Sequence, residues 1–216
     1  MSIVEEICRL RTELEGANEI DVGELALLIG KSGFSCVRCA RCCRGESGDN
    51  EVALFPGEIR EIMSVSGRSW LEVALPPDSN DFDLFGARHT FEWVLRRKPD
   101  GDCIFLEGGL CTIYEHRPWI CRTYPFHLRG VDLLACECDS THTTGLPVRQ
   151  AVQMAAALKR RQVYELEETI ALLERYVPFE PGRPSDTGRI IVHDSEGMKY
   201  VKKSDACGYD FSRGMW

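Results

Sequence analysis

The sequence predicts an α+β fold that is mostly helical, with short strands around a cysteine-ligated centre, a long C-terminal helix and a hairpin. Three observations predict it. Amphipathic helical patterns occupy residues 2–15 and the stretch after Pro147. Short strand-like runs are separated by Gly- and Pro-containing turns. Nine of the eleven cysteines lie between residues 36 and 138, so thiol chemistry is concentrated in the middle of the chain.

Residues 1–33 are expected to form an N-terminal helical segment. Residues 2–15 carry an apolar stripe opposite charged positions. Asp21 is a suitable N-cap for a helix from Val22 to Ile29, and Gly30 closes it. The next domain, residues 34–145, contains nine of the eleven cysteines. Within it, Pro56 opens a helix over 57–66 and Ser69 caps a short helix that runs to Ala74.

The strands of this domain are predicted to be short. Residues 78–86 indicate a loop, residues 90–95 a strand, and residues 103–106 its partner across the turn 98–101. Residues 131–136 indicate one more strand.

The C-terminal part begins with a long helix in residues 146–177, from Val148 to about Tyr176, because this stretch contains no Gly or Pro and keeps an apolar stripe. Residues 178–216 are then expected to form a linker, a hairpin around residues 194–197, and an aromatic tail. The tail carries Tyr209, Phe211 and Trp216, and we expect it to dock on its own body or on another protein.

Composition excludes several classes of protein. The net charge of −8 disfavours a nucleic-acid binder, because phosphate contacts need a basic surface. No apolar run approaches the ~18 residues of a membrane span. The first residues are acidic and amphipathic, unlike a signal peptide, and the cysteines are odd in number and clustered, unlike a disulfide framework. We therefore expect a cytoplasmic protein with reduced thiols.

Four cysteines fall within eight residues: Cys36, Cys39, Cys42 and Cys43. Thiolates at this spacing can converge on one metal ion or iron–sulfur cluster. Adjacent side chains usually diverge, so Cys42 and Cys43 need not reach the same ion. The remaining cysteines of the middle stretch allow either two centres or one centre with spare thiols. The irregular spacing favours an iron–sulfur cluster, [4Fe-4S], over zinc. The isolated Cys8 and Cys207 are expected to be small buried apolar residues.

A second stretch, from Cys111 to Phe126, contains residues that could tune such a centre. Arg117 and Arg122 bracket Cys121, and Tyr114 and Tyr124 can donate hydrogen bonds. His116, His127 and His142 are possible nitrogen ligands, while His89 and His193 are weaker candidates.

These residues resemble the YkgJ-like cysteine-cluster family, described as zinc- or iron-chelating CxxCxxCC proteins. The matching parts are the Cys36–Cys43 quartet and Cys111-x-Ile-Tyr-x-x-Arg-Pro-x-x-Cys121-Arg-x-Tyr-Pro-Phe126, within residues 34–138. The resemblance implies a bound metal or cluster. It implies as candidate ligands Cys36, Cys39, Cys42, Cys43, Cys111 and Cys121, with Cys103 in a position where a cysteine often precedes Cys111. Cys136 and Cys138 are less secure cofactor-binding candidates.

Three functions remain open. The first is an iron–sulfur or zinc accessory protein that docks on a larger protein or complex and responds to redox state or oxygen. The second is a protein lysine-N-methyltransferase, because flagellin lysine-N-methylases are similar in cysteine content. The glycines at 30–33 and 107–109, however, lack the spacing of a nucleotide-binding turn. The third is a structural zinc module for protein contacts. A binding role is favoured over an enzyme, since no catalytic triad can be assembled from local motifs.

Overall fold

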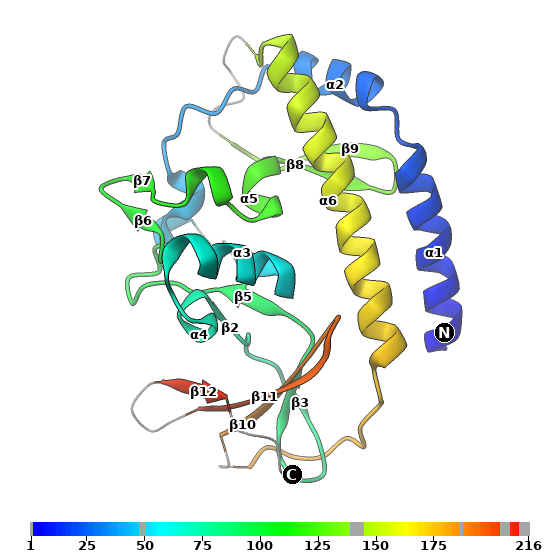
Figure 1. Cartoon of the computed structure of the whole chain (residues 1–216), viewed down its shortest axis with the longest axis vertical. Helices are drawn as coiled ribbons and strands as arrows, with labels where there is room; N and C mark the ends of the chain where they lie inside the picture. Colours follow the sequence, from blue (N-terminus) through cyan, green and yellow to red (C-terminus); the bar gives the residue numbers. More distant parts are fainter. Residues whose placement is uncertain (1, 48–50, 139–144, 186–187, 204–207, 212–216) are drawn as a thin grey trace. The chain divides into compact units, whose positions relative to one another are not determined.

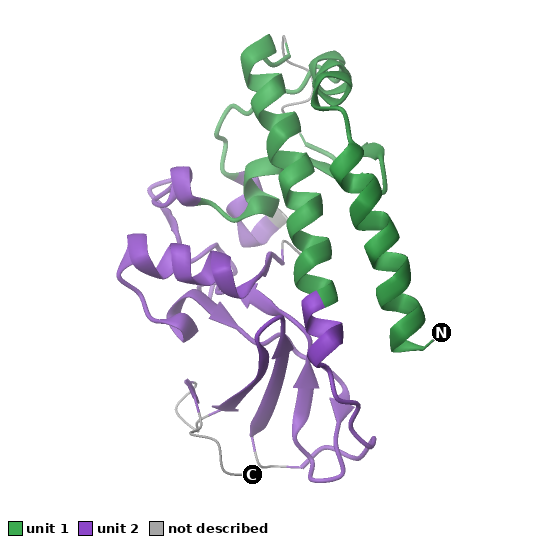
Figure 2. Ribbon diagram, turned by 45° about the vertical axis from the view of Figure 1, so that its right-hand side comes forward, with its two compact units in different colours: residues 1–40, 117–170 green, residues 41–116, 171–216 purple. Residues whose placement is uncertain are grey.

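The structure, a computed structural model, describes residues 2–47, 51–138, 145–185, 188–203 and 208–211. Its helices, small sheets and C-terminal hairpin confirm the predicted α+β class. The chain divides into two compact units, each made from two separate stretches (Figure 2). The first unit contains residues 1–40 and 117–170, and the second contains residues 41–116 and 171–216. The four-segment division expected from the sequence stays a prediction.

The first unit contains four helices and one hairpin in its described residues (Figure 1). The helices are α1 (Ile3–Glu19), α2 (Val22–Lys31), α5 (Trp119–Thr123) and the larger part of α6 (Val148–Arg175). The hairpin pairs β8 (Phe126–Arg129) with β9 (Asp132–Ala135). The side chains of Ser2 and Asp21 accept backbone N–H bonds at the starts of α1 and α2. The predicted long helix is confirmed, with 28 residues spanning about 42 Å.

The core of the first unit joins α2, α6 and β8. Its buried members are Leu25, Ala26, Ile29, Phe34, Phe126, Ala151, Ala155 and Leu158. The rings of Phe34 and Phe126 meet edge to face, with centroids 5.3 Å apart. Ala151 and Ala155 of α6 belong to the same buried cluster as these rings. The chain is therefore anchored against β8 only two residues before Cys36.

In its described residues, the second unit contains short helices and three sheets. Its helical elements are η1 (Arg41–Cys43), η2 (Gly45–Ser47), α3 (Pro56–Ser66), α4 (Trp70–Val73) and η3 (Tyr114–His116). Its strands are β1 (Ala53–Leu54), β2 (Ala74–Leu75), β3 (Asp81–Phe82), β4 (Arg88–Thr90), β5 (Trp93–Leu95), β6 (Leu106–Glu107), β7 (Leu110–Cys111), β10 (Arg189–Asp194), β11 (Gly197–Lys203) and β12 (Tyr209–Phe211). They form sheets in the orders β1-β5-β2, β12-β11-β10-β4-β3 and β6-β7.

Two strand predictions were wrong. The single strand expected over 90–95 is two strands, because β4 joins the five-stranded sheet while β5 pairs with β1 and β2. Residues 103–106 do not form a strand beside it: a single bridge links Arg97 to Cys103, and β6 pairs with β7. The turn at 98–101 did form, since the Gly101 N–H donates to the Lys98 carbonyl. The loop expected over 78–86 also contains β3.

The predicted C-terminal hairpin is confirmed as β10 and β11, which pair from Arg189–Lys202 to Asp194–Gly197. The described part of the tail docks within its own unit. Strand β12 pairs with β11, and the Phe211 ring centroid lies 6.3 Å from that of Trp70 and 6.2 Å from that of Trp93. Trp216 lies outside the described residues.

Two glycines, at which an added side chain would meet no other atom, allow a test of the helix boundaries. A Cβ at Gly16 or at Gly67 would meet no atom within 4 Å. Gly16 lies inside α1, so Gly16→Ala should stabilise the protein by about 0.5–1 kcal/mol. Gly67 ends α3 with φ +69°, so Gly67→Ala should destabilise it by about 1–2 kcal/mol. Urea denaturation of both variants gives the comparison, and equal signs would contradict these helix boundaries.

Candidate metal centre

The cysteine motif contains two residues in an uncommon backbone conformation. Arg38 has φ 55° and Ala40 has φ 58°, on either side of Cys39. A non-glycine residue in this left-handed region costs about 1–3 kcal/mol, and such residues concentrate at functional sites. Cys36, Cys39 and Cys42 are exposed and Cys43 is half-buried.

The end of this motif is bound to another cysteine segment of the second unit. The Cys103 N–H donates to the Cys43 carbonyl at 2.8 Å, and the Gly45 N–H donates to Asp102 Oδ1 at 3.0 Å. A Cβ on Gly45 would lie 2.7 Å from the backbone of Gly101, so this close approach requires glycine. The two backbones thereby bring Cys43 to Cys103.

Cys111 joins the same group through a compact loop. The Leu106 N–H donates to the Cys103 carbonyl at 2.9 Å, and Leu106 pairs with Cys111 across the β6–β7 hairpin. Cys103 is buried. Burial raises the pKa of its thiol, and the nearby Cys111 raises it further. Binding of a metal ion here would therefore release a proton from Cys103.

The first unit holds the other cysteines of the domain. Its hairpin places Cys136 Sγ 3.9 Å from His127 Nδ1, and the Cys136 N–H donates to the Pro125 carbonyl at 2.9 Å. Cys136 is exposed, and Cys121 on α5 is half-buried. Cys138 packs against the apolar core of this unit. The hairpin register pairs His127 with Leu134, so Cys136, two residues beyond Leu134, is the diagonal neighbour of His127. Counting antiparallel partners back from a turn at Gly130 could have found this diagonal pair from the sequence.

The arginines and tyrosines expected to influence the metal centre make contacts of several kinds. The Tyr124 hydroxyl donates to the Glu137 carbonyl at 2.7 Å and so fixes the backbone between Cys136 and Cys138. The Arg122 guanidinium donates to the Arg117 carbonyl and lies 5.0 Å from the Trp119 ring centroid. Tyr114 lies in η3 of the second unit. The roles of all four residues stay predictions.

The other sequence candidates are placed as follows. His116 Nδ1 lies 3.1 Å from Glu61 Oε1, within hydrogen-bonding distance. His142 and Cys207 lie outside the described residues. Cys8 is exposed on α1, so its expected burial was wrong. It occupies the solvent side of the helix, where an amphipathic pattern tolerates small residues.

The donor chemistry fits zinc or iron, since thiolates and imidazole are ligands of both. Within the described parts of the chain, however, no three His, Cys, Asp or Glu side chains already surround one point. The structure thus brings cysteines together through backbone contacts, and the final approach of the sulfurs would accompany metal binding.

A buried histidine pair lies outside the cysteine segments. Asp83 Oδ1 accepts the N–H groups of Phe85 and Ala87, and its Oδ2 lies 3.4 Å from His89 Nε2. His89 Nε2–H therefore donates to Asp83, which leaves Nδ1 to accept the His193 Nε2–H at 2.8 Å. The Phe179 ring stacks on the His89 ring, with centroids 3.6 Å apart. Nothing in the sequence revealed this series of hydrogen bonds, because it depends on the parallel pairing of β4 with β10.

This pair predicts a loss of stability in acid. Burial, and then the neighbouring His89, lower the pKa of His193 to about 4. The folded state thus binds fewer protons than the unfolded state, whose histidine titrates near 6.5. The contribution of His193 to the free energy of unfolding is fully present above pH 6.5. The free energy of unfolding should fall by up to about 3 kcal/mol as the pH approaches 4.

Urea denaturation from pH 7.5 to 4 measures this loss. His193→Gln is the matched variant, because it removes the titration and keeps an amide that can donate. The free energy of unfolding of this variant should fall less steeply with decreasing pH than that of the wild type. Equal slopes would contradict the assignment.

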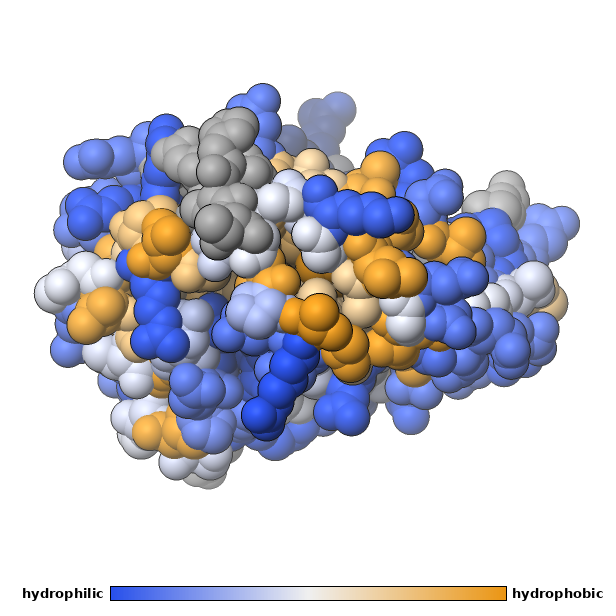
Figure 3. Space-filling view, turned by 90° about the horizontal axis from the view of Figure 1, so that it is seen from above, coloured by the Kyte–Doolittle hydropathy of each residue, from blue (hydrophilic) through white to orange (hydrophobic). Residues whose placement is uncertain are grey.

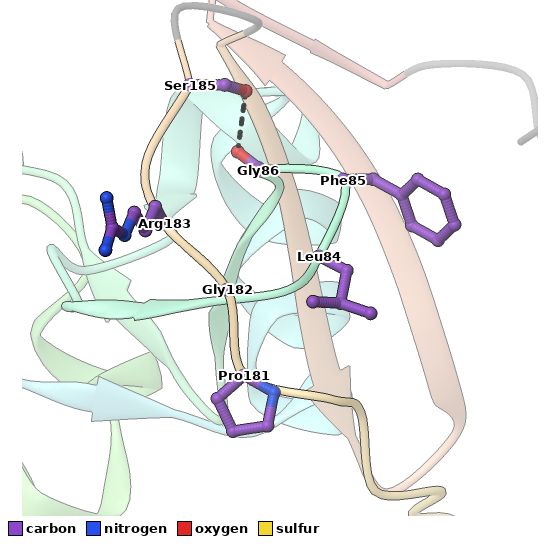
Figure 4. Close-up of a pocket in the computed structure, with 7 residues that line it drawn as sticks. All are labelled: Leu84, Phe85, Gly86, Pro181, Gly182, Arg183 and Ser185. Carbon is purple, nitrogen blue, oxygen red and sulfur yellow. Dashed lines mark hydrogen bonds between the residues drawn. The ribbon is translucent and has the colours of Figure 1, made fainter.

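An open pocket of about 550 Å³ lies in the second unit, beside the loop that follows β3 (Figure 4). Its lining residues are Leu84, Phe85, Gly86, Pro181, Gly182, Arg183 and Ser185. Ser185 Oγ donates to the Gly86 carbonyl at 3.1 Å. A Cβ on Gly182 would lie 2.0 Å from the Asp83 carbonyl oxygen, so glycine permits the two segments to run side by side. None of the lining residues is a cysteine, so this pocket is chemically unlike the thiol groups.

Comparison with protein families agrees with the donor set. Residues 35–141 match the family described as "CxxCxxCC: Putative zinc- or iron-chelating domain". No curated protein and no solved structure matches the chain. The matched segment is about half of the chain and contains all nine cysteines from Cys36 to Cys138. The chain therefore belongs, through residues 35–141, to the CxxCxxCC family, whose domain is described as zinc- or iron-chelating.

Proposed function

We propose that this chain is an iron–sulfur accessory protein that docks on a larger protein or complex and responds to redox state or oxygen. The observation that carries the proposal is the approach of Cys43, Cys103 and Cys111 in the second unit. Together with the exposed Cys42, these residues offer sulfur as the only donor atom, which suits a cluster. When bound, a cluster supplies one-electron transfer and sensitivity to oxygen.

Exposed apolar side chains support the docking part of the proposal. They reach the surface among polar residues (Figure 3). On α2, Leu27 and Leu28 are exposed, and at the start of α6 Val148 and Val152 are exposed. Groups of exposed apolar residues mark contact surfaces for other proteins. The described helices include none that is long and apolar enough to span a membrane.

A structural zinc module is the second candidate. The observation that favours it is the 3.9 Å approach of His127 Nδ1 to Cys136 Sγ, because zinc readily takes imidazole together with thiolate. Zinc is redox-silent, so this reading would remove the response to oxygen and keep the docking role.

The two candidates differ in colour and in sulfide content. We expect protein purified without oxygen to absorb visible light, to contain acid-labile sulfide, and to lose both on exposure to air. The control is Cys8→Ser, which removes a thiol outside the cysteine-rich segment and should behave as the wild type. Colourless protein with stoichiometric zinc and no sulfide would reject the cluster in favour of the zinc module.

A further inference from the structure

The quartet of cysteines is attached to a different group of donors at each end. Before Cys36, the buried Phe34 packs on Phe126 at the start of β8. The next residue of that strand is His127, and the preceding Pro125 carbonyl accepts the N–H of Cys136. The N-terminal end of the motif is thus anchored within the first unit on the strand that also carries His127.

The C-terminal end is fixed within the second unit. Cys43 is bonded to Cys103 through the backbone, and the approach of Gly45 to Gly101 leaves no room for a side chain. Cys111 belongs to the same loop assembly. Between the two ends, the left-handed Arg38 and Ala40 redirect the chain around Cys39.

The number of donors agrees with this division. A tetrahedral zinc ion or a four-iron cluster takes four ligands, so nine cysteines exceed the need of one centre. The second unit contributes Cys42, Cys43, Cys103 and Cys111. The first unit contributes Cys36, Cys39, Cys121 and Cys136, together with His127. Cys138 packs on the apolar core and is not needed for either count.

We propose that the chain holds two metal centres, an all-sulfur centre in the second unit and a mixed sulfur–nitrogen centre in the first. This inference rests on the proposed function, since it requires that the cysteines bind metal at all. The difference in donors gives the two centres different chemistry: all-thiolate ligation suits a cluster, and an imidazole in the set suits zinc.

The test compares iron and zinc bound per chain after anaerobic purification. Cys111→Ser should lose the metal of the second unit and retain the rest, while Cys136→Ser should do the reverse. The double variant should lose both amounts, so that the losses add. His127→Ala should reduce only the metal lost by Cys136→Ser, and Cys8→Ser should lose none.

A single variant that loses all metal, or two variants that lose none, would overturn the two-centre inference while leaving metal binding intact. A metal-free wild type would instead overturn the proposed function. If a variant does not fold, cobalt(II) titration of the wild-type chain decides. Two centres predict two equivalents with different spectra, because sulfur-only and sulfur–nitrogen sites absorb at different wavelengths. One equivalent with one spectrum would contradict the inference.

Discussion

Removal of the bound metal will lower the melting temperature of this protein by roughly 10 °C. A ligand present at a thousandfold excess over its Kd stabilises the folded state by about 4 kcal/mol, and 1 kcal/mol shifts a chain of this size by about 2–4 °C. The expected effect is large because three of the four motif cysteines are exposed and two neighbouring residues are strained. Little apolar burial holds this segment, so ligation must supply the order.

Circular dichroism melts under anaerobic conditions, with and without a chelator, measure the shift. The control is the Cys111→Ser, Cys136→Ser double variant, in which the chelator should have little effect. Equal melting temperatures for loaded and chelated wild type would show that the metal does not contribute to folding.

Trp93→Ala will destabilise the second unit by about 3–5 kcal/mol. Trp93 on β5 is fully buried, its ring centroid lies 5.3 Å from that of Trp70, and its Nε1–H donates to Asp194 Oδ2 at 2.9 Å. The substitution removes the largest buried side chain of this unit and one partner of a buried carboxylate. Lys199 Nζ also binds Asp194, at 2.6 Å, and keeps that charge paired.

Urea denaturation measures this loss. Trp93→Phe should recover most of the packing and retain a deficit of about 1–3 kcal/mol, because Asp194 loses a hydrogen bond. Phe85→Ala is the exposed aromatic control, since the Phe85 side chain is 77% exposed and its removal should change stability by less than about 0.5 kcal/mol. Similar values for Trp93→Ala and Phe85→Ala would refute the assigned core.

Local signals predicted the regular elements well. Pro56 and Gly67 bound α3, Pro147 precedes α6, and the turn at 194–197 joins β10 to β11. Each of these depends on backbone preferences or periodicity within a few residues, which a sequence displays directly.

Contacts between distant segments could not be predicted in the same way. Strands β1 and β2 have two residues each, too few to show alternation, so the partners of β5 were missed. The approach of Cys43 to Cys103 depends on two glycines 56 positions apart in the chain, Gly45 and Gly101. The His89–His193 bond likewise depends on strand pairing across about a hundred residues. Cysteine spacing predicted the candidate donors, and the backbone contact between Cys43 and Cys103 could be found only from the fold.

The most direct measurement is the iron, acid-labile sulfide and zinc content of the chain purified without oxygen. Metal at one or more equivalents per folded chain, abolished by serine at Cys111 and Cys136 together, is the predicted result. A folded, monodisperse wild-type chain that contains none of the three and takes up none on reconstitution would contradict the account.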